Sequence, residues 1–329
     1  MAQDGFLNKN EAENKFENDL KEGKWMEYED SSWNAVANEN IAVYYRLVIY
    51  KKGQPFGIVR DYFKSGRLQF EGKIINLREN GKDVLDGKCK WYYEDGGLKQ
   101  EGTYIDSLPC GGKGYYKSGQ LKFELAPCVS NKANGSAKNY YENGKLMVET
   151  PYVNGIPNGI AKEYYESGSL KGEQMWSMGK REDTLKSYYK NGSLKFESPY
   201  SNGKLNGIVK EYYESGKLKG EYPWSDGKRS GIIKIYYENG NLKNTTPYSD
   251  NKKNGTVEEY YENGKLNWET TYIYDQKNGD AKEYYENGKL KWEGAFNNDK
   301  RNGVAKTYYE NGKLYKTIYY IDGVIQDEK

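Results

Sequence analysis

A pair of adjacent tyrosines recurs at a fixed interval and is the main chemical feature of this 329-residue chain. Tyr284-Tyr285 opens the string Tyr-Tyr-Glu-Asn-Gly-Lys-Leu, and the same pair returns every 24 residues between Tyr140 and Tyr308. A phenol ring offers a large rigid contact area and one hydroxyl, which suits binding to another molecule. The first tyrosines of the pairs are therefore a candidate exposed stripe for binding, made of Tyr164, Tyr188, Tyr212, Tyr236, Tyr260 and Tyr284.

Catalytic chemistry is not predicted. The chain has no histidine, which removes the commonest general base, the Ser-His and Cys-His nucleophile systems and the commonest transition-metal ligand. Loop aspartates such as Asp226 and Asp250 lack the alternating acidic spacing of a calcium loop, and turn formation accounts for them. We expect no catalytic residue, no cofactor and no metal ion.

Each repeated unit is predicted to be a β-hairpin. Asn287-Gly288 lies between two runs of alternating polarity, and both residues tolerate the positive φ angles of a two-residue type I′ turn. Such a turn would pair Tyr285 with Leu290, and Tyr284 with Lys291. It would also pair Glu283 with Trp292.

Side chains alternate between the two faces of a strand, so this register gives each hairpin one solvent-exposed face and one buried face. The predicted solvent face carries Lys282, Tyr284, Glu286, Lys289, Lys291 and Glu293. The face predicted to be buried carries Ala281, Tyr285, Leu290, Trp292 and Phe296. Aromatic residues of the buried face form a candidate binding groove, made of Trp176, Trp224, Trp268, Trp292, Tyr213 and Tyr285.

Glycine-rich second turns such as Asn202-Gly203 are short, so consecutive hairpins must be neighbours in space. The predicted fold class is all-β: an elongated single-sheet array of antiparallel hairpins, rolled into a trough that hides its apolar face. An apolar content of 36%, with 15% aromatic residues, fits a thin array better than a thick three-layer core.

Three segments are predicted along the chain. Residues 1–23 are expected to contain a short capping helix, because Ala12, Phe16 and Leu20 are spaced by four, Asn8 can cap the start and Gly23 can end it. Residues 24–130 form irregular hairpins, and residues 131–329 form regular 24-residue repeats. The irregular hairpins have two interpretations: they recognise a specific partner, or they are terminal units that have drifted.

The three cysteines, Cys89, Cys110 and Cys128, cannot form a complete disulfide set. They are either small residues that fill irregular packing, or they include a bridge between Cys110 and Cys128.

Composition narrows the class of partner and the location. The 50 basic and 48 acidic residues alternate along the strands, so neither nucleic acid nor an acidic membrane surface is expected as a partner. A run of about 18 apolar residues, as a membrane span requires, is absent from the sequence. Ala2, Gln3 and Asp4 behind Met1 resemble the residues that follow signal-peptide cleavage. We expect a secreted, periplasmic or cell-surface protein, with a cytoplasmic location as the alternative.

The Tyr-Tyr-Glu-Asn-Gly-Lys-Leu string, followed by an aromatic residue and Asn-Gly-Lys-x-Asn-Gly, resembles the bacterial variant of the MORN repeat from about residue 40 onward. This resemblance implies a ribbon of β-hairpins without enzymatic activity that acts as a scaffold in protein association. Some bacterial members are similar to antitoxin or immunity partners of secreted toxins. Eukaryotic MORN proteins are linked to phospholipid binding, which the dispersed charge of this chain does not favour.

The expected function is a non-catalytic scaffold that binds another, unidentified protein through its tyrosine-rich surface. One alternative is a glycan or cell-wall binding module that uses the tryptophan groove, and another is an immunity or antitoxin partner of a secreted toxin. A purely structural role is also open for the stripe, in which each tyrosine packs under a cross-strand lysine such as Lys219 opposite Tyr212. The oligomeric state is left open.

Overall fold

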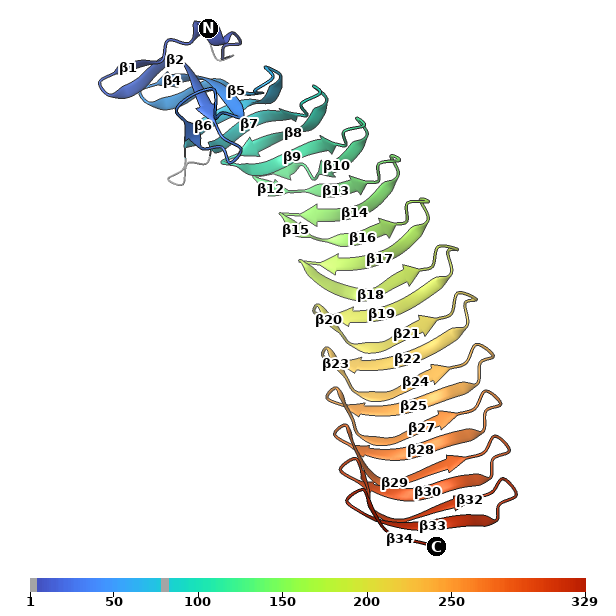
Figure 1. Ribbon diagram of the computed structural model, residues 1–329. Helices are drawn as coiled ribbons and strands as arrows, with labels where there is room; N and C mark the ends of the chain where they lie inside the picture. Colours follow the sequence, from blue (N-terminus) through green and yellow to red (C-terminus); the bar gives the residue numbers. More distant parts are fainter. Residues whose placement is uncertain (1–4, 78–82) are drawn as a thin grey trace. The chain divides into compact units, whose positions relative to one another are not determined.

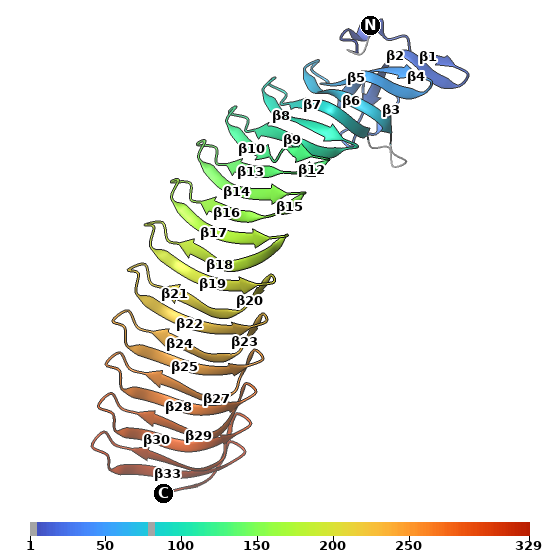
Figure 2. The ribbon, with the colours of Figure 1, turned by 180° about the vertical axis from the view of Figure 1, so that it is seen from behind.

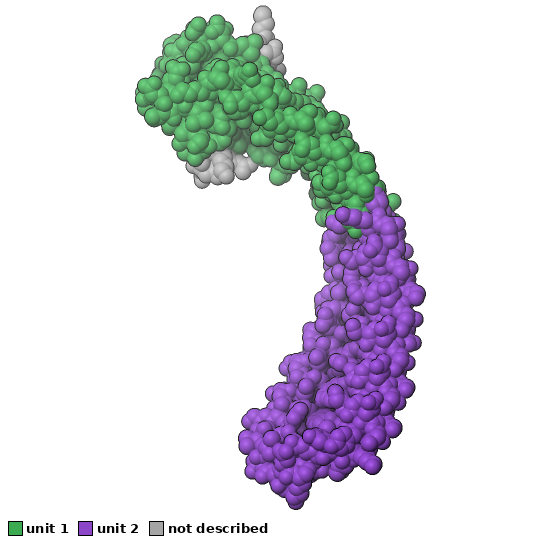
Figure 3. Space-filling model, turned by 45° about the vertical axis from the view of Figure 1, so that its right-hand side comes forward, with its two compact units in different colours: residues 1–168 green, residues 169–329 purple. Residues whose placement is uncertain are grey.

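β-Strands make up nearly all the regular structure of the computed structural model, which describes residues 5–77 and 83–329 (Figure 1). The chain has two units, residues 1–168 and 169–329 (Figure 3). In each unit, consecutive strands run antiparallel and pair with their sequence neighbours, as Figure 2 also shows from behind. The predicted all-β hairpin array is therefore confirmed. The predicted signal-peptide junction at Ala2, Gln3 and Asp4 lies outside the described residues.

The first unit begins with a single 3-10 turn and continues as a meander. Its elements are η1 (Lys9–Glu11), β1 (Lys15–Glu17), β2 (Leu20–Glu29), β3 (Ala35–Val36), β4 (Tyr44–Lys51), β5 (Gln54–Phe63), β6 (Leu68–Leu77), β7 (Asp83–Tyr92), β8 (Leu98–Ile105), β9 (Leu108–Tyr115), β10 (Leu121–Leu125), β11 (Cys128–Val129), β12 (Lys132–Ala133), β13 (Gly135–Tyr140), β14 (Leu146–Val153), β15 (Ile156–Pro157) and β16 (Gly159–Tyr164).

The second unit repeats the same pattern with greater regularity. Its strands are β17 (Leu170–Ser177), β18 (Lys180–Tyr188), β19 (Leu194–Ser201), β20 (Lys204–Leu205), β21 (Gly207–Tyr212), β22 (Leu218–Ser225), β23 (Lys228–Arg229), β24 (Gly231–Tyr236), β25 (Leu242–Ser249), β26 (Lys252–Lys253), β27 (Gly255–Tyr260), β28 (Leu266–Ile273), β29 (Gln276–Tyr284), β30 (Leu290–Asn297), β31 (Lys300–Arg301), β32 (Gly303–Tyr308), β33 (Leu314–Ile321) and β34 (Val324–Glu328).

The tyrosine-bearing corner of each repeat is a three-residue loop and not the predicted two-residue turn. Gly288 N–H donates to the carbonyl of Tyr285 at 2.8 Å, and Tyr285 N–H donates to the carbonyl of Lys289 at 2.8 Å. Gly288 has a φ of +91°, whereas the φ of Asn287 is not positive. The side-chain oxygen of Asn287 accepts the Lys289 N–H at 2.9 Å. This geometry is that of a type I turn followed by a glycine bulge.

The type I′ geometry occurs at the other corner of the repeat. Asn202 and Gly203 have φ angles of +53° and +82°, and the flanking Ser201 and Lys204 pair directly. The Asn-Gly dipeptide is thus used in two ways, and the sequence-based interpretation assigned the tighter turn to the wrong corner.

The three-residue loop changes the register only next to the corner. Tyr284 pairs with Leu290, a bulge follows at Lys291, and Glu283 then pairs with Trp292 as predicted. Leu290 therefore lies on the face of its partner Tyr284, whereas the Lys291 ammonium bonds Glu283 at 2.7 Å and lies over the Tyr285 ring. The predicted faces of Leu290 and Lys291 were wrong, because the bulge residue reverses the alternation once.

The two faces of each hairpin are named here by their constant residues. The tyrosine–glutamate face carries Tyr284 and Glu293 and their equivalents, such as Tyr212 and Glu221. The tryptophan face carries Ala281, Trp292 and their equivalents and holds most of the buried residues. In the second unit its cluster comprises Ala281, Trp292, Ala305 and Tyr320. In the first unit it comprises Trp25, Val48, Tyr50, Val59, Phe70, Ile74, Cys89 and Tyr104.

The predicted helix within residues 1–23 was wrong. Asn8 does cap a turn, since its side chain accepts the Asn10 N–H at 3.0 Å, but the turn ends at Glu11. β1 and β2 then form a hairpin whose corner residues Asn18 and Asp19 have φ angles of +49° and +63°. Strand pairing prevails because Phe16 packs edge-on against the buried Trp25, with 4.8 Å between ring centroids.

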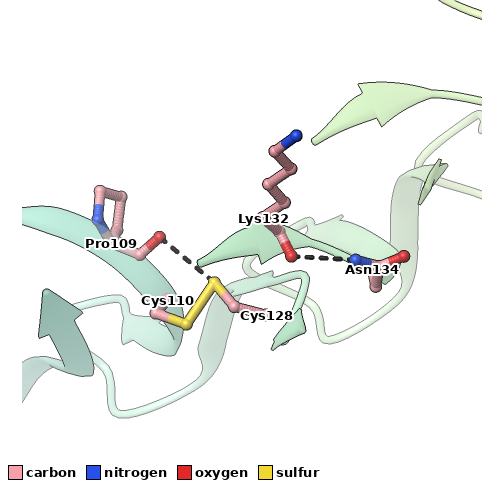
Figure 4. The surroundings of a disulfide bond; sticks show 5 residues. All are labelled: Pro109, Cys110, Cys128, Lys132 and Asn134. Carbon is pink, nitrogen blue, oxygen red and sulfur yellow. Dashed lines mark hydrogen bonds between the residues drawn. A yellow bond between two sulfur atoms is a disulfide. The ribbon is translucent and has the colours of Figure 1, made fainter. Parts of the chain in front are cut away.

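Cys110 and Cys128 form a disulfide, with Cα atoms 5.1 Å apart, while Cys89 is free and buried (Figure 4). The bridge joins β9 to β11, which precedes the turn into β12. Beside it, the Asn134 side chain donates to the carbonyl of Lys132 at 3.0 Å. Of the two alternatives for the cysteines, the bridge is the one that the structure contains.

Replacing a corner glycine tests the loop geometry. Gly216 has a φ of +86°, and a Cβ built there meets no atom within 4 Å. We therefore expect Gly216→Ala to lower the free energy of unfolding by about 1 kcal/mol through backbone strain alone. Gly216→Asn is the matched control and should cost less, because asparagine tolerates the left-handed region. Urea unfolding of both variants measures the difference, and equal stability of the alanine variant and the parent would contradict the loop assignment.

Candidate functional site

The first tyrosines of the repeats form a row on the tyrosine–glutamate face, and in the second unit their hydroxyls donate to glutamates. Tyr212 donates to Glu197 at 2.8 Å and Tyr284 donates to Glu269 at 3.0 Å. The same contact joins Tyr188 to Glu173, Tyr236 to Glu221 and Tyr308 to Glu293. Tyr260 instead donates to Glu258 on its own strand. Tyr164, in the first unit, ends β16 at the equivalent register position.

These tyrosines are half-buried and not freely exposed, so the stripe is less open than its sequence pattern suggests. Burial, followed by the hydrogen bond to Glu197, raises the pKa of Tyr212 to about 12. Burial and the contacts with Glu269 have the same effect on Tyr284, whose pKa rises to about 12. The hydroxyls of Tyr212 and Tyr284 are therefore neutral donors at physiological pH.

Ile208 and Ile232, in adjacent repeats, form a short exposed apolar strip beside the tyrosine row and are 50% and 52% exposed. Val304, three repeats further along, is 52% exposed, and Thr256 and Asp280 occupy the equivalent positions between. Ile208 pairs with Pro223 and Ile232 pairs with Pro247, so proline rings widen the strip. Prediction from the sequence missed this strip, although its signal was present: the residue four before each first tyrosine is isoleucine or valine in several repeats.

The second tyrosines have a structural role between repeats. The hydroxyl of Tyr213 donates to the backbone carbonyl of Tyr236 at 2.7 Å, and that of Tyr285 donates to the carbonyl of Tyr308 at 2.8 Å. Lys219 lies 5.8 Å from the centroid of the Tyr213 ring. The expected contact of Lys219 with Tyr212 was therefore wrong, and the bulge that moves the lysine to the tryptophan face is the reason.

The four tryptophans of the candidate groove are half-buried or buried, and a cationic side chain lies against a ring of each. Arg181 lies 5.6 Å from the Trp176 ring, and Arg229 lies 5.5 Å from the Trp224 ring. Trp268 and Trp292 stack on each other with centroids 5.7 Å apart, and Lys277 and Arg301 approach their rings. These cations recur at intervals of 24 or 48 residues, a signal that prediction from the sequence did not use.

The structure does not bring the candidate groove together as one open aromatic surface. Tyr213 and Tyr285 lie near the corner loops and bond backbone carbonyls, while Trp176 and Trp224 lie near the opposite ends of their strands. Trp268 and Trp292 contribute to packing within the second unit. The tryptophan face is therefore mainly a core lined with ring–cation contacts.

A hollow of about 660 Å³ lies on the irregular hairpins of the first unit. Gly111 and Gly112 contribute backbone to it, and Lys88, Lys90 and Lys113 contribute side chains. Lys113 bonds Glu124 at 3.1 Å, and Glu101 also lines the hollow, so the acidic residues offset part of the basic charge.

Within residues 5–77 and 83–329, no group of three or more His, Cys, Asp or Glu side chains is arranged to hold a metal ion. The same residues include no helix with the length and apolarity needed to cross a bilayer.

Comparison with known proteins finds repeats of one family. The family described as "MORN repeat variant" matches residues 85–106, 133–154, 157–177, 184–202, 205–226, 229–250, 253–274, 277–298 and 301–322. No curated protein matches the chain.

Similar solved structures include parts of much larger toxin chains. A TcdB2-TccC3-Cdc42 crystal structure is 11% identical over 87% of this chain and 19% of that chain, with a TM-score of 0.17. A TcdB2-TccC3 crystal structure is 13% identical over 90% of this chain and 18% of that chain, with a TM-score of 0.17. A Photorhabdus luminescens Tc holotoxin pore is 13% identical over 87% of this chain and 19% of that chain, with a TM-score of 0.13. This chain spans less than one fifth of the length of each. TM-scores this low carry no argument about fold or function.

Removing single hydroxyls tests the second tyrosines as links between repeats. Tyr285→Phe should lower the free energy of unfolding by about 1 kcal/mol, because the Tyr308 carbonyl loses its donor. Tyr309→Phe is the matched control, since Tyr309 occupies the same position in the last repeat and is 51% exposed. Removing the hydroxyl of Tyr309 should change the free energy of unfolding little. Urea unfolding compares the two, and equal effects would contradict the role of the hydrogen bond.

High pH should weaken the fold through the first tyrosines. Their hydroxyls titrate near pH 10 when unfolded and, for Tyr212, Tyr260 and Tyr284, near pH 12 when folded. Because the folded pKa is raised, this stabilisation is complete below pH 10 and is lost as the pH rises through 12. Absorbance at 295 nm should show a set of tyrosines that ionise about two pH units late, with unfolding in the same range. Titration of every tyrosine near pH 10 in the folded protein would refute this.

Proposed function

The chain belongs to the MORN repeat variant family, and we propose that it is a non-catalytic scaffold that binds another protein through the tyrosine–glutamate face of its repeats. Members of this family are typically repeat scaffolds for interaction and not enzymes. The absence of histidine from the sequence agrees with such a role.

One observation carries the proposal: the second unit presents a row of tyrosines beside the exposed side chains of Ile208 and Ile232, with Val304 exposed further along the chain. Tyrosine rings and exposed apolar side chains supply contact area. A partner that offers apolar side chains at matching positions would fit this arrangement. An extended protein segment meets that requirement.

The charge of the face supports a protein partner over a polyanion. Two lysines beside the tyrosine row are paired with glutamates: Lys282 with Glu269 at 3.5 Å and Lys306 with Glu293 at 3.6 Å. A surface of paired charges lacks the basic excess that nucleic acid or an acidic membrane requires. Glycan binding and an immunity or antitoxin role stay hypotheses, and the half-buried tryptophans with their adjacent cations do not favour the former.

We also propose an oxidising location, either secreted, periplasmic or at the cell surface. The Cys110–Cys128 bridge supports this, since disulfides persist outside reducing compartments.

Site-specific photo-crosslinking tests the binding face. A photoreactive amino acid at position 208 lies on the tyrosine–glutamate face, and the same residue at position 259 lies on the tryptophan face opposite Trp268. Both original side chains, Ile208 and Glu259, are exposed, so neither replacement should disturb folding. In cells of the native source we expect one defined protein adduct from position 208 and none from position 259.

A double variant then tests necessity. Ile208→Asp with Ile232→Asp should abolish the adduct when the photoreactive group is placed at the neighbouring position 256, while Glu259→Lys should leave it intact. Adducts from position 259 alone would show that the opposite face binds, and no protein adduct from any position would refute the scaffold function.

A further inference from the structure

A small cavity in the first unit differs from every surface described above. It has a volume of about 170 Å³, smaller than the pockets of about 300 to 1,000 Å³ that hold whole small molecules. Trp33, Phe70 and Trp91 form aromatic walls, and Arg46, Asp61 and Asp83 form a polar base. A space of this size suits the end of one side chain.

Among the described residues, the polar base of the cavity has one basic and two acidic side chains. Arg46, which is 7% exposed, bonds both oxygens of Asp61 at 2.7 and 2.9 Å and both oxygens of Asp83 at 3.0 and 2.7 Å. Glu29 lies 3.5 Å from the same guanidinium, and burial raises its pKa to about 8. Burial also raises the pKa of Asp61, an effect that Arg46 opposes. Among the described residues that line the cavity, Arg46 is the one basic side chain beside Asp61 and Asp83.

The bulge position carries different residues in different hairpins. In two regular repeats it is a lysine that bonds a strand glutamate: Lys219 bonds Glu211 and Lys291 bonds Glu283, both at 2.7 Å. In other repeats it is Met147, Asn267 or Tyr315. The same bulge occurs where Tyr62 pairs with Leu68 and Asp61 pairs with Phe70, which makes Gln69 the equivalent of those lysines. Gln69 lines the cavity, and its buried Oε1 has no hydrogen-bond partner among the described residues.

Trp33 stands at the rim in a conformation that requires local support. It is 41% exposed, has a φ of +63° and stacks on Tyr44 with ring centroids 4.3 Å apart. Asp30 holds its loop by accepting the N–H groups of Ser32 and Asn34 at 2.8 and 3.0 Å. A large ring is thus fixed beside the cavity and remains accessible from solvent.

We propose that this cavity binds the cationic end of a lysine or arginine side chain from the protein partner. The inference rests on the proposed scaffold function and adds to it a separate contact on the tryptophan face of the first unit, where Asp61 and Gln69 lie. The incoming cation would occupy the place that Lys219 and Lys291 take in their own repeats. It would give Gln69 Oε1 a donor, approach Asp61 and Asp83, and lie against the faces of Trp33 and Trp91.

Small probes test the cavity without knowledge of the partner. The full-length protein is titrated with arginine amide and, as a matched neutral control, with citrulline amide, while tryptophan fluorescence is recorded. Citrulline amide has nearly the same shape but no charged guanidinium. We expect a saturable change with arginine amide, and at least tenfold weaker binding of citrulline amide. Equal binding of the two, binding of neither, or preferential binding of a neutral sugar such as glucose would overturn the proposal.

Two variants locate the binding in the cavity. Gln69→Lys introduces the residue that Lys219 and Lys291 supply in their own repeats. It should fill the site internally, which abolishes the response while leaving the circular dichroism spectrum unchanged. Asp83→Asn removes one carboxylate and should weaken arginine amide at least tenfold. Gln69→Met, a neutral control, should retain the preference for arginine over citrulline. Binding by Gln69→Lys as tight as by the parent would place the probe elsewhere.

The cavity and the scaffold function can fail separately. If the adduct from position 208 forms but arginine amide does not bind, the cavity proposal alone is refuted. If arginine amide binds as expected but no protein adduct forms, the cavity stands as a cation site and the scaffold function is refuted.

Discussion

The hydrogen bond from each second tyrosine to the backbone carbonyl of the next first tyrosine is the contact on which the regular structure depends. Tyr213 reaches Tyr236 and Tyr237 reaches Tyr260, each across 23 residues in the sequence. This bond fixes the distance between adjacent corner loops. The neighbouring first tyrosine then reaches back to a glutamate of the preceding repeat, as Tyr236 does to Glu221. One tyrosine pair thus ties three repeats together, and an insertion in any repeat would break contacts on both sides, which accounts for the strict period.

Strand alternation could be predicted from the sequence because it depends on each strand's own pattern. Glu283 does pair with Trp292, and Trp292 is buried beside Ala281. The length of the loop at each corner could not be predicted in the same way, since Asn-Gly fits both a two-residue turn and the end of a three-residue loop. Gly288 alone takes positive φ at one corner, while Asn202 and Gly203 share it at the other. That one-residue difference decides the faces of Leu290 and Lys291.

The contacts that sequence reasoning missed come from neighbouring strands. Ala12, Phe16 and Leu20 have a helical spacing, yet Phe16 finds Trp25 only after β1 and β2 pair through the Asn18-Asp19 turn. The accessibility of the first tyrosines was overestimated for a similar reason. Their pattern predicts which face they occupy. The glutamates that accept from their hydroxyls belong to the preceding repeat, except for Glu258 beside Tyr260, so these contacts depend on how neighbouring repeats pair and not on one repeat alone.

A surface of identical units binds many registers of a partner with equal affinity, so specificity has to come from departures from the repeat. Gln69 is such a departure, because it stands at the bulge position where Lys219 and Lys291 bond a glutamate in their own repeats. Its buried Oε1 has no hydrogen-bond partner among the described residues, and an unsatisfied buried acceptor costs stability. A site that keeps this cost beside an accessible Trp33 is better explained by what it can receive from outside than by its contribution to the fold.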